Sequence, residues 1–282
     1  MRPAPAGCLP LAADSVCATQ QFVKQWCLRA PASSARSLAA FPLGVRRLRG
    51  RRDGATFRAM RSRVLVVNPN SSVSCTEGIA AALRPLASDA VRFDVVRLPE
   101  GPPAVASWRD WFAVAEPLRR VVLREEAAAY VVACVSDPGL DAAREATARP
   151  VLGMLRCAVS AALARGAERF GIIGFTAASQ ARQRRVLQSM GVEGRLAAWE
   201  PLDLPMETLT DPVAPRARVA DAACALAAGG AEAIVLGCTG LAGHAAVAED
   251  AAGVPVIEPC RAAGAMALLA VLGDAPRGRV SG

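Results

Sequence analysis

The sequence predicts an α/β protein built from two similar halves, each with a mostly parallel sheet flanked by helices. Short apolar runs typical of buried strands alternate with helical stretches from residue 61 to about 272. Such alternation is typical of parallel sheets, because crossover helices cover both faces of the sheet. Three pairs of matching positions are separated by 108, 104 and 105 residues: Asn68 and Thr176, Cys134 and Cys238, and Pro150 and Pro255.

Residues 1–60 differ from the rest of the chain. They are rich in Ala, Pro, Ser and Arg and contain no glutamate. We expect them to be a disordered extension. Their composition would fit a transit peptide, or residues upstream of a true translation start at Met60. The expected halves are then 61–157 and 158–258, with 259–275 packing back on the first half and 276–282 forming a tail.

The sequence of the first half predicts eight alternating strands and helices. Continuous apolar runs predict the strands, and Ser71 or Ser72 caps the first helix. The expected strands are 64–67, 91–98, 130–133 and 150–153, and the expected helices are 76–83, 111–130, one opened by 136–138, and 156–165.

The second half repeats this order. The Pro-Val strand at 150–153 has its counterpart at 254–257, where Val-Pro-Val-Ile recurs. The expected strands are 170–175, 233–236 and 254–257, and the expected helices are 181–190, 215–228 and 261–272.

The net charge of +8 comes from the N-terminal segment. Residues 1–63 hold 12 basic and two acidic side chains, whereas the remainder holds 21 basic and 23 acidic ones. The folded body is therefore nearly neutral, and we expect no nucleic-acid partner. No apolar run reaches the ~18–20 residues of a membrane helix, so no membrane association is expected either.

Residue counts exclude several kinds of chemistry. Lys24 is the only lysine, so the body has no Schiff-base or P-loop lysine. His244 is the only histidine, which excludes multi-histidine metal sites. We therefore expect neither cofactor nor metal. The nine cysteines form no C-x-x-C pair and favour reduced thiols in the cytoplasm.

Two cysteines recur in the same setting. Cys134 and Cys238 each follow a short apolar run, and polar and glycine residues come next. A thiol at such a strand end lies near unpaired backbone N–H groups, so we expect a lowered pKa. If the halves face each other across a cleft, the two thiols lie on opposite sides of a substrate carbon. One of them, as a thiolate, would remove a proton from one face, and the other would deliver a proton to the opposite face. The expected substrate-binding groups are Asn68, Val135, Ser136, Thr176, Thr239 and Gly240.

Several motifs resemble the hydantoin racemase branch of the aspartate/glutamate racemase superfamily. They are Val-Val-Asn-Pro-Asn-Ser-Ser at 66–72, Ala-Cys-Val-Ser-Asp-Pro-Gly-Leu at 133–140, Ala-Arg-Glu at 143–145, Arg-Phe-Gly-Ile-Ile at 169–173, Ile-Val-Leu-Gly-Cys-Thr-Gly-Leu at 234–241 and Gly-Val-Pro-Val-Ile-Glu-Pro at 253–259. The resemblance covers about 62 to 272. It implies two Rossmann-like halves, cofactor-independent racemisation by Cys134 and Cys238 in the cleft, and a homo-oligomer.

The resemblance also bears on the small-molecule substrate. Branches that racemise free acidic amino acids usually have Asn-Thr after the first cysteine, whereas this chain has Val135 and Ser136. Neither cysteine motif contains an arginine to bind a carboxylate. A 5-substituted hydantoin or allantoin is therefore favoured over an aspartate/glutamate racemase or a maleate-type isomerase.

Two hypotheses of other classes stay open. His244 follows Cys238 by six residues, so a cysteine hydrolase with a Cys–His pair is conceivable. A non-catalytic small-molecule-binding protein is the third class, because a single cysteine at a strand end is more often a small buried apolar residue.

Overall fold

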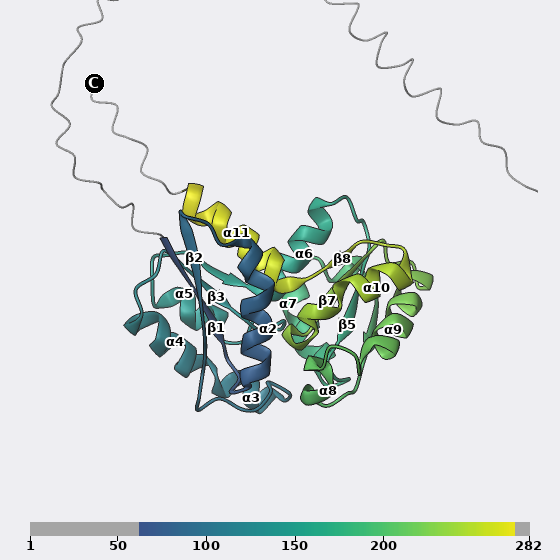
Figure 1. The fold of residues 1–282 in the computed structure, drawn as a ribbon, viewed down its shortest axis with the longest axis horizontal. Helices are drawn as coiled ribbons and strands as arrows, with labels where there is room; N and C mark the ends of the chain where they lie inside the picture. The colour runs from purple at the N-terminus through teal and green to yellow at the C-terminus, as the bar shows by residue number, and fades with distance from the viewer. Residues whose placement is uncertain (1–61, 274–282) are drawn as a thin grey trace, which may run out of the picture. The chain divides into compact units, whose positions relative to one another are not determined.

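Eight parallel strands form two four-stranded sheets with the same strand order. The computed structural model describes residues 62–273, so the expected extension (1–60) and tail (276–282) lie outside the described residues. The first sheet has the order β2-β1-β3-β4 and the second the order β6-β5-β7-β8 (Figure 1). The predicted fold class of two similar parallel α/β halves is confirmed.

The first sheet is built from β1 (Ser62–Asn68), β2 (Val91–Arg97), β3 (Ala129–Val132) and β4 (Val151–Gly153). Its side chains alternate between two cores, as the pleat requires. Val64 and Val66 face one core, and Leu65 and Val67 face the other. The helices between these strands are α2 (Val73–Leu83), α3 (Trp108–Ala113), α4 (Ala115–Arg124) and α5 (Leu140–Glu145).

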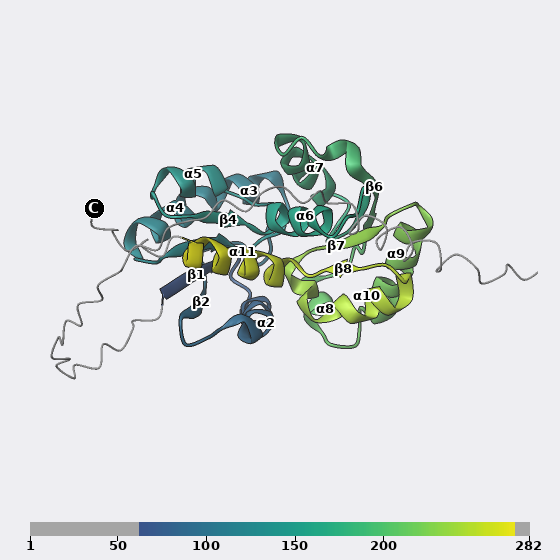
Figure 2. The same cartoon turned by 90° about the horizontal axis from the view of Figure 1, so that it is seen from above.

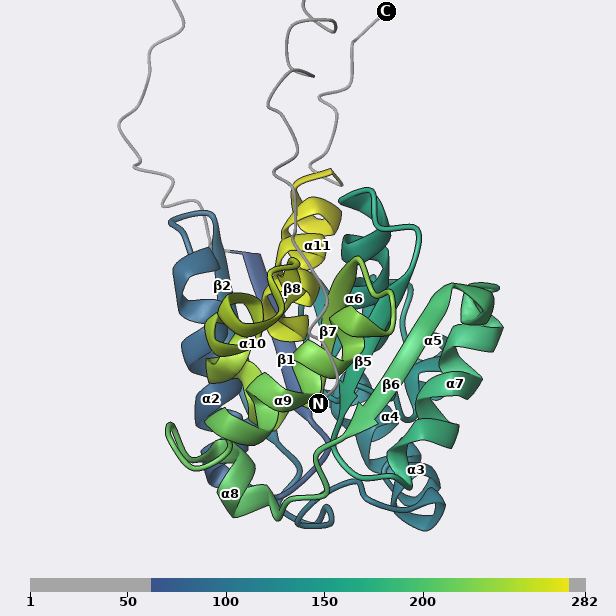
Figure 3. The ribbon, with the colours of Figure 1, turned by 90° about the vertical axis from the view of Figure 1, so that its right-hand side faces the viewer.

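The second sheet is built from β5 (Phe170–Gly174), β6 (Leu196–Pro201), β7 (Ala233–Gly237) and β8 (Val256–Ile257). Figure 2 and Figure 3 show α7 beside β6. The helices around this sheet are α6 (Met154–Ala164), α7 (Ser179–Ser189), α8 (Met206–Thr210), α9 (Arg216–Ala228) and α10 (Ala245–Ala252), with a 3-10 helix at Thr239–His244. The last described helix is α11 (Pro259–Gly273).

One hydrophobic core joins the two halves. It contains Val64 and Val131 from the first sheet, Ile172 and Val235 from the second, and Ala158 of α6. Helix α11 packs against α6, α2 and β3, while α6 also contacts β7 and β8. The expected boundary between the two halves, at residues 157 and 158, falls inside α6. Because α6 belongs to the shared core, this boundary stays a prediction.

The expected helix 111–130 is wrong in detail. The structure divides it into α3 and α4, and α4 ends at Arg124. Pro117 explains the break, because its ring has no N–H and clashes with the carbonyl four residues earlier, at Ala113. Strand β6 and helices α8 and α10 had no predicted counterpart.

None of the helices within residues 62–273 combines the length and the apolar character needed to span a bilayer.

Candidate active site

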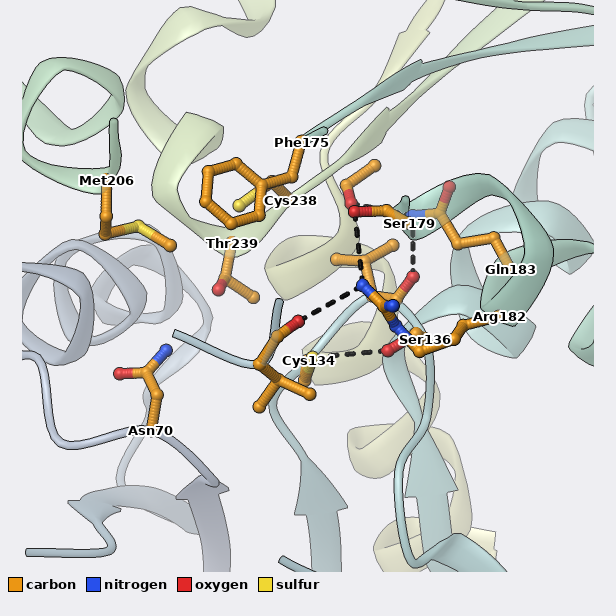
Figure 4. A pocket seen from close by; sticks show the side chains of 13 residues that line it. Asn70, Cys134, Ser136, Phe175, Ser179, Arg182, Gln183, Met206, Cys238 and Thr239 are labelled. Atoms are coloured by element: carbon orange, nitrogen blue, oxygen red, sulfur yellow. Dashed lines mark hydrogen bonds between the residues drawn. The ribbon is translucent and has the colours of Figure 1, made fainter. Parts of the chain in front are cut away.

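A small cavity lies at the carboxyl ends of the central strands of both sheets. Ligands of parallel α/β folds bind at this edge, because the connecting loops diverge there. Its volume is about 30 Å³, and both halves contribute to its wall (Figure 4). The lining residues are Asn70, Val105, Cys134, Val135, Ser136, Phe175, Ser179, Arg182, Gln183, Met206, Gly237, Cys238 and Thr239.

The turn after β3 holds Cys134. The Asp137 N–H donates a 3.0 Å hydrogen bond to the Cys134 carbonyl, and Asp137 has a φ of 47°. Aspartate tolerates this left-handed conformation better than most residues do. The Cys134 Sγ lies 3.6 Å from the Ser136 Oγ, and the Trp111 Nε1 donates to the Ser136 carbonyl at 2.9 Å. The turn therefore aims the thiol into the cavity with a hydroxyl beside it.

Asp137 fixes this turn to the start of α6. Its carboxylate accepts hydrogen bonds from the backbone N–H groups of Leu155 at 2.9 Å and Arg156 at 3.1 Å. A Cβ on Gly153 would lie 2.4 Å from the Asp137 Cγ, so only glycine permits the approach. Burial raises the pKa of Asp137 to about 6, against the opposing effect of these donors. Asp137 is thus a helix cap that positions the Cys134 turn.

Cys238 comes directly after β7 and is 7% exposed. The Gly240 backbone N–H interacts with its thiol. Its neighbour Thr239 places Oγ1 3.2 Å from the Sγ of Cys75, a buried thiol of α2. The second cysteine therefore faces the same cavity as Cys134, from the opposite half of the fold.

The expected lowering of the thiol pKa values is contradicted. Burial raises the pKa of Cys134 to about 11, although Ser136 donors oppose the shift. Burial also raises the pKa of Cys238, and the Gly240 N–H opposes it. The thiols follow strands rather than opening long helices, so the desolvation of a thiolate outweighs the backbone donors. A thiolate at this site needs a further source of positive charge.

Gln183 of α7 links the two cysteine loops. Its Nε2 donates to the Val135 carbonyl at 2.9 Å and to the Gly237 carbonyl at 2.8 Å. Its Oε1 accepts a 2.6 Å hydrogen bond from the Trp199 Nε1 of β6. One buried amide thus holds the residue after Cys134 and the residue before Cys238 at a fixed separation.

Arg182 directly precedes Gln183 in α7 and is 1% exposed. Its Nη1 donates to the Ala178 carbonyl at 3.0 Å, and its Nη2 lies 3.4 Å from both the Val105 carbonyl and the Ser179 Oγ. Figure 4 shows the guanidinium reaching toward Cys134 and Ser136. The cysteine motifs contain no arginine, but α7 brings Arg182 into the wall of the same cavity.

Five of the eight predicted site residues line the cavity: Cys134, Cys238, Val135, Ser136 and Thr239. Asn68, Thr176 and Gly240 do not line it. Asn68 is fully buried and donates to the Asn70 Oδ1 at 2.9 Å, so it supports Asn70, which does line the cavity.

Thr176 and Gly240 lie close to lining residues. The Thr176 Oγ1 is 3.2 Å from the Ser179 Oγ, and a Cβ on Gly240 would lie 3.6 Å from the Cys238 Sγ. The cavity is also lined by Asn70, Ser179, Arg182 and Gln183, which the sequence did not predict as site residues. Asn70 alone had a signal, since it stands in the motif quoted at 66–72.

His244 faces a different cavity of about 310 Å³, next to Arg261 and Cys75. Burial lowers the pKa of His244, and the backbone of Asp211 and Leu209 interacts with its ring. Thr239 lines both cavities and separates them. Within residues 62–273, no group of three or more His, Cys, Asp or Glu side chains is arranged to hold a metal ion.

Comparison with known proteins gives a consistent result. The family model for Asp/Glu/hydantoin racemases matches residues 64–267. A hydantoin racemase from Paenarthrobacter aurescens is 33% identical over 207 residues, which are 71% of this chain and 87% of that protein.

Two solved structures are similar along most of the described chain. The allantoin racemase from Klebsiella pneumoniae has a TM-score of 0.66 and 33% identity, covering 75% of this chain and 89% of its own. The allantoin racemase from Pseudomonas fluorescens has a TM-score of 0.69 and 27% identity, covering 75% and 92%. The chain belongs to the Asp/Glu/hydantoin racemase family.

Proposed function

We propose that this protein is a cofactor-independent racemase that inverts C5 of 5-substituted hydantoins, allantoin included. The observation that carries the proposal is that Cys134 and Cys238, from equivalent strand ends of the two halves, line one cavity. The relatives named hydantoin racemase and allantoin racemase support this substrate class.

The reaction needs one base and one acid on opposite sides of a carbon. The thiolate of one cysteine takes the C5 proton, and the electrons of the C–H bond move onto the adjacent carbonyl oxygen. The thiol of the other cysteine then delivers its proton to the opposite face of C5 and becomes the thiolate. The next enantiomer reverses these roles.

The enolate oxygen needs donors that are already in place. Ser136 and Thr239 offer hydroxyls at the cavity wall, and the Asn70 amide lies nearby. Backbone N–H groups of Val135, Ser136, Thr239 and Gly240 are the further donors that we propose. Asn68 and Thr176 contribute by positioning Asn70 and Ser179.

The cavity of about 30 Å³ holds roughly one or two waters rather than a five-membered ring with a substituent. We therefore propose that the loops around it move apart to admit substrate. A larger hollow of about 250 Å³, lined by Ser74, Pro103 and Met206, shares Met206 with the cavity and marks the entrance.

The test is to incubate pure D- and L-5-benzylhydantoin, and each enantiomer of allantoin, with the protein in deuterated water. Polarimetry should show loss of rotation from both enantiomers, and ¹H NMR should show deuterium entering at C5. Aspartate, glutamate and maleate serve as comparison substrates. Turnover of those three without any hydantoin turnover would contradict the proposed substrate class.

We also propose that the protein acts as a homo-oligomer in the cytoplasm. Described cysteines are free thiols, which supports a reducing compartment, and large apolar side chains such as Phe112 and Leu269 are 60% and 74% exposed. Light scattering behind size exclusion tests the first statement, where a monomer at micromolar concentration would contradict it. Cell fractionation tests the second.

A further inference from the structure

Among the described residues that line the cavity, Arg182 is the only charged one, and the proposed mechanism above does not use it. Its side chain is 1% exposed and ranks among the largest fully buried side chains of the described chain. Removing a guanidinium from water is costly unless a negative group offsets its charge. A buried cation at this position therefore needs an explanation.

The hydrogen bonds of Arg182 leave donors unused. Nη1 has one short bond, to the Ala178 carbonyl, and both bonds of Nη2 are long, at 3.4 Å. Nε is buried and has no partner among residues 62–273. A guanidinium has five N–H donors, so this one can still bind an acceptor in the cavity.

Within residues 62–273, no carboxylate forms a close ion pair with Arg182. The acidic groups that act on it are Cys134 and Asp110. Asp110 directs its Oδ2 to the N–H groups of Ser107 and Ala106 and to the Ser107 hydroxyl, because it closes the capping box of α3. Cys134 is thus the acidic group in the cavity wall that interacts electrostatically with Arg182.

The second cysteine has a different environment. The groups that act on Cys238 are the Gly240 N–H and the thiols of Cys75 and Cys134. The two thiols come from equivalent positions of the two halves, yet the electrostatic interactions of Arg182 include Cys134 and not Cys238. The duplicated fold therefore contains an asymmetric pair of bases.

We propose that Arg182 makes Cys134 the thiolate of the resting pair and then holds the negative charge as it passes to the enolate oxygen of the substrate. The part about the enolate rests on the proposed racemase function. The total charge stays at minus one throughout. It lies first on the Cys134 sulfur, next on the enolate oxygen after Cys134 has gained the proton, and last on the Cys238 sulfur after that thiol has protonated C5.

The experiment measures which cysteine is the thiolate, and it needs no substrate. The full chain is labelled with iodoacetamide between pH 6 and 10, and peptide mapping by mass spectrometry gives the rate at Cys134 and at Cys238. Wild type should label Cys134 at least about tenfold faster than Cys238 at pH 8, since one pKa unit is a tenfold change in thiolate.

Three variants isolate the charge. Arg182→Gln should slow Cys134 labelling about ten- to a hundredfold and move its pH profile upward, because a unit charge roughly 6–12 Å from a thiolate shifts its pKa by about one to two units at an effective dielectric near 20. Arg182→Lys keeps the charge and should stay within about threefold of wild type. Arg184→Gln is the matched control, because Arg184 lies on α7 with an exposed ion pair to Glu193. Unchanged labelling of Cys134 in a folded Arg182→Gln variant overturns the proposal.

A measurement on wild type keeps the proposal testable if the variants do not fold. Protein labelled with ¹³Cβ-cysteine is titrated by NMR, and Cys134 should ionise at lower pH than Cys238. The reverse order overturns the inference. These results are separate from the proposed function: labelling that follows Arg182 without hydantoin turnover contradicts only the racemase, and turnover with labelling independent of Arg182 contradicts only the role of Arg182.

Discussion

The side-chain amide of Gln183 donates a 2.8 Å hydrogen bond to the backbone carbonyl of Gly237, the residue that precedes Cys238. The same nitrogen donates to the Val135 carbonyl, the residue that follows Cys134, at 2.9 Å. The separation of the two candidate bases is therefore set by one side chain. A two-base reaction depends on this distance, since a misplaced acid or base loses much of its rate advantage.

Replacing Gln183 with methionine should impair both folding stability and turnover. The change leaves two carbonyls and the Trp199 N–H buried without partners. Urea denaturation should show a loss of about 2–4 kcal/mol, and kcat should fall about tenfold or more. Gln188→Met is the control, because Gln188 is an exposed glutamine of the same helix. A Gln183→Met protein with wild-type stability and kcat would show that the bridge is dispensable.

Asp137 predicts a particular pH dependence of stability. Burial raises its pKa to about 6 from a usual value of 3.8, so the folded state binds the proton more tightly than the unfolded state. The stabilisation by the protonated form is fully present below about pH 4 and is lost as the pH rises through about 6. It amounts to roughly 2–3 kcal/mol by linkage.

Urea denaturation of wild type and of Asp137→Asn between pH 4 and 7.5 checks this dependence. Wild type should lose stability relative to the variant as the pH rises from about 4 to about 7. The asparagine variant should be less stable than wild type at pH 4, because its amide accepts with one oxygen only and its NH2 group faces a backbone N–H donor. A stability difference that stays constant over this range would mean that Asp137 keeps an ordinary pKa.

His244 provides a test against the cysteine hydrolase hypothesis. It lines the larger cavity behind Thr239 and does not line the cavity of Cys134 and Cys238. His244→Gln should therefore keep racemisation within about threefold of wild type and lose about 1 kcal/mol of stability from its backbone contacts. Measured kcat that falls by orders of magnitude, with Cys134→Ser remaining active, would favour the Cys–His pair instead.

The strands and the two catalytic candidates could be predicted from the sequence because their signals are local. Buried parallel strands such as β3 and β7 are continuous apolar runs, and a polar residue after such a run marks the binding edge. The duplicated order of elements then brought Cys134 and Cys238 to matching positions. Strand β6 had no such signal, since Leu-Ala-Ala-Trp-Glu-Pro lacks β-branched residues.

Arg182 and Gln183 could not be predicted, because their roles depend on tertiary structure. Helix α7 reads Ser-Gln-Ala-Arg-Gln-Arg-Arg, and nothing in this composition tells a buried arginine from the exposed Arg184 and Arg185. The predicted lowering of the thiol pKa values was wrong for the same reason. A strand-end position gives backbone donors, but the desolvation that outweighs them comes from residues far away in sequence.

The central claim is that Cys134 and Cys238 act on opposite faces of one carbon, and exchange by single-cysteine variants tests it most directly. Each enantiomer of 5-benzylhydantoin is incubated in deuterated water with Cys134→Ser, Cys238→Ser or the double variant, and ¹H NMR follows C5 while circular dichroism follows inversion. Cys224→Ser, which changes an exposed thiol, is the control and should retain wild-type activity.

We expect each single variant to lose racemisation while still exchanging the C5 proton of one enantiomer, the two variants choosing opposite enantiomers. The double variant should match the rate without protein. Racemisation at the wild-type rate by both single variants, or exchange of the same enantiomer by both, would contradict the account.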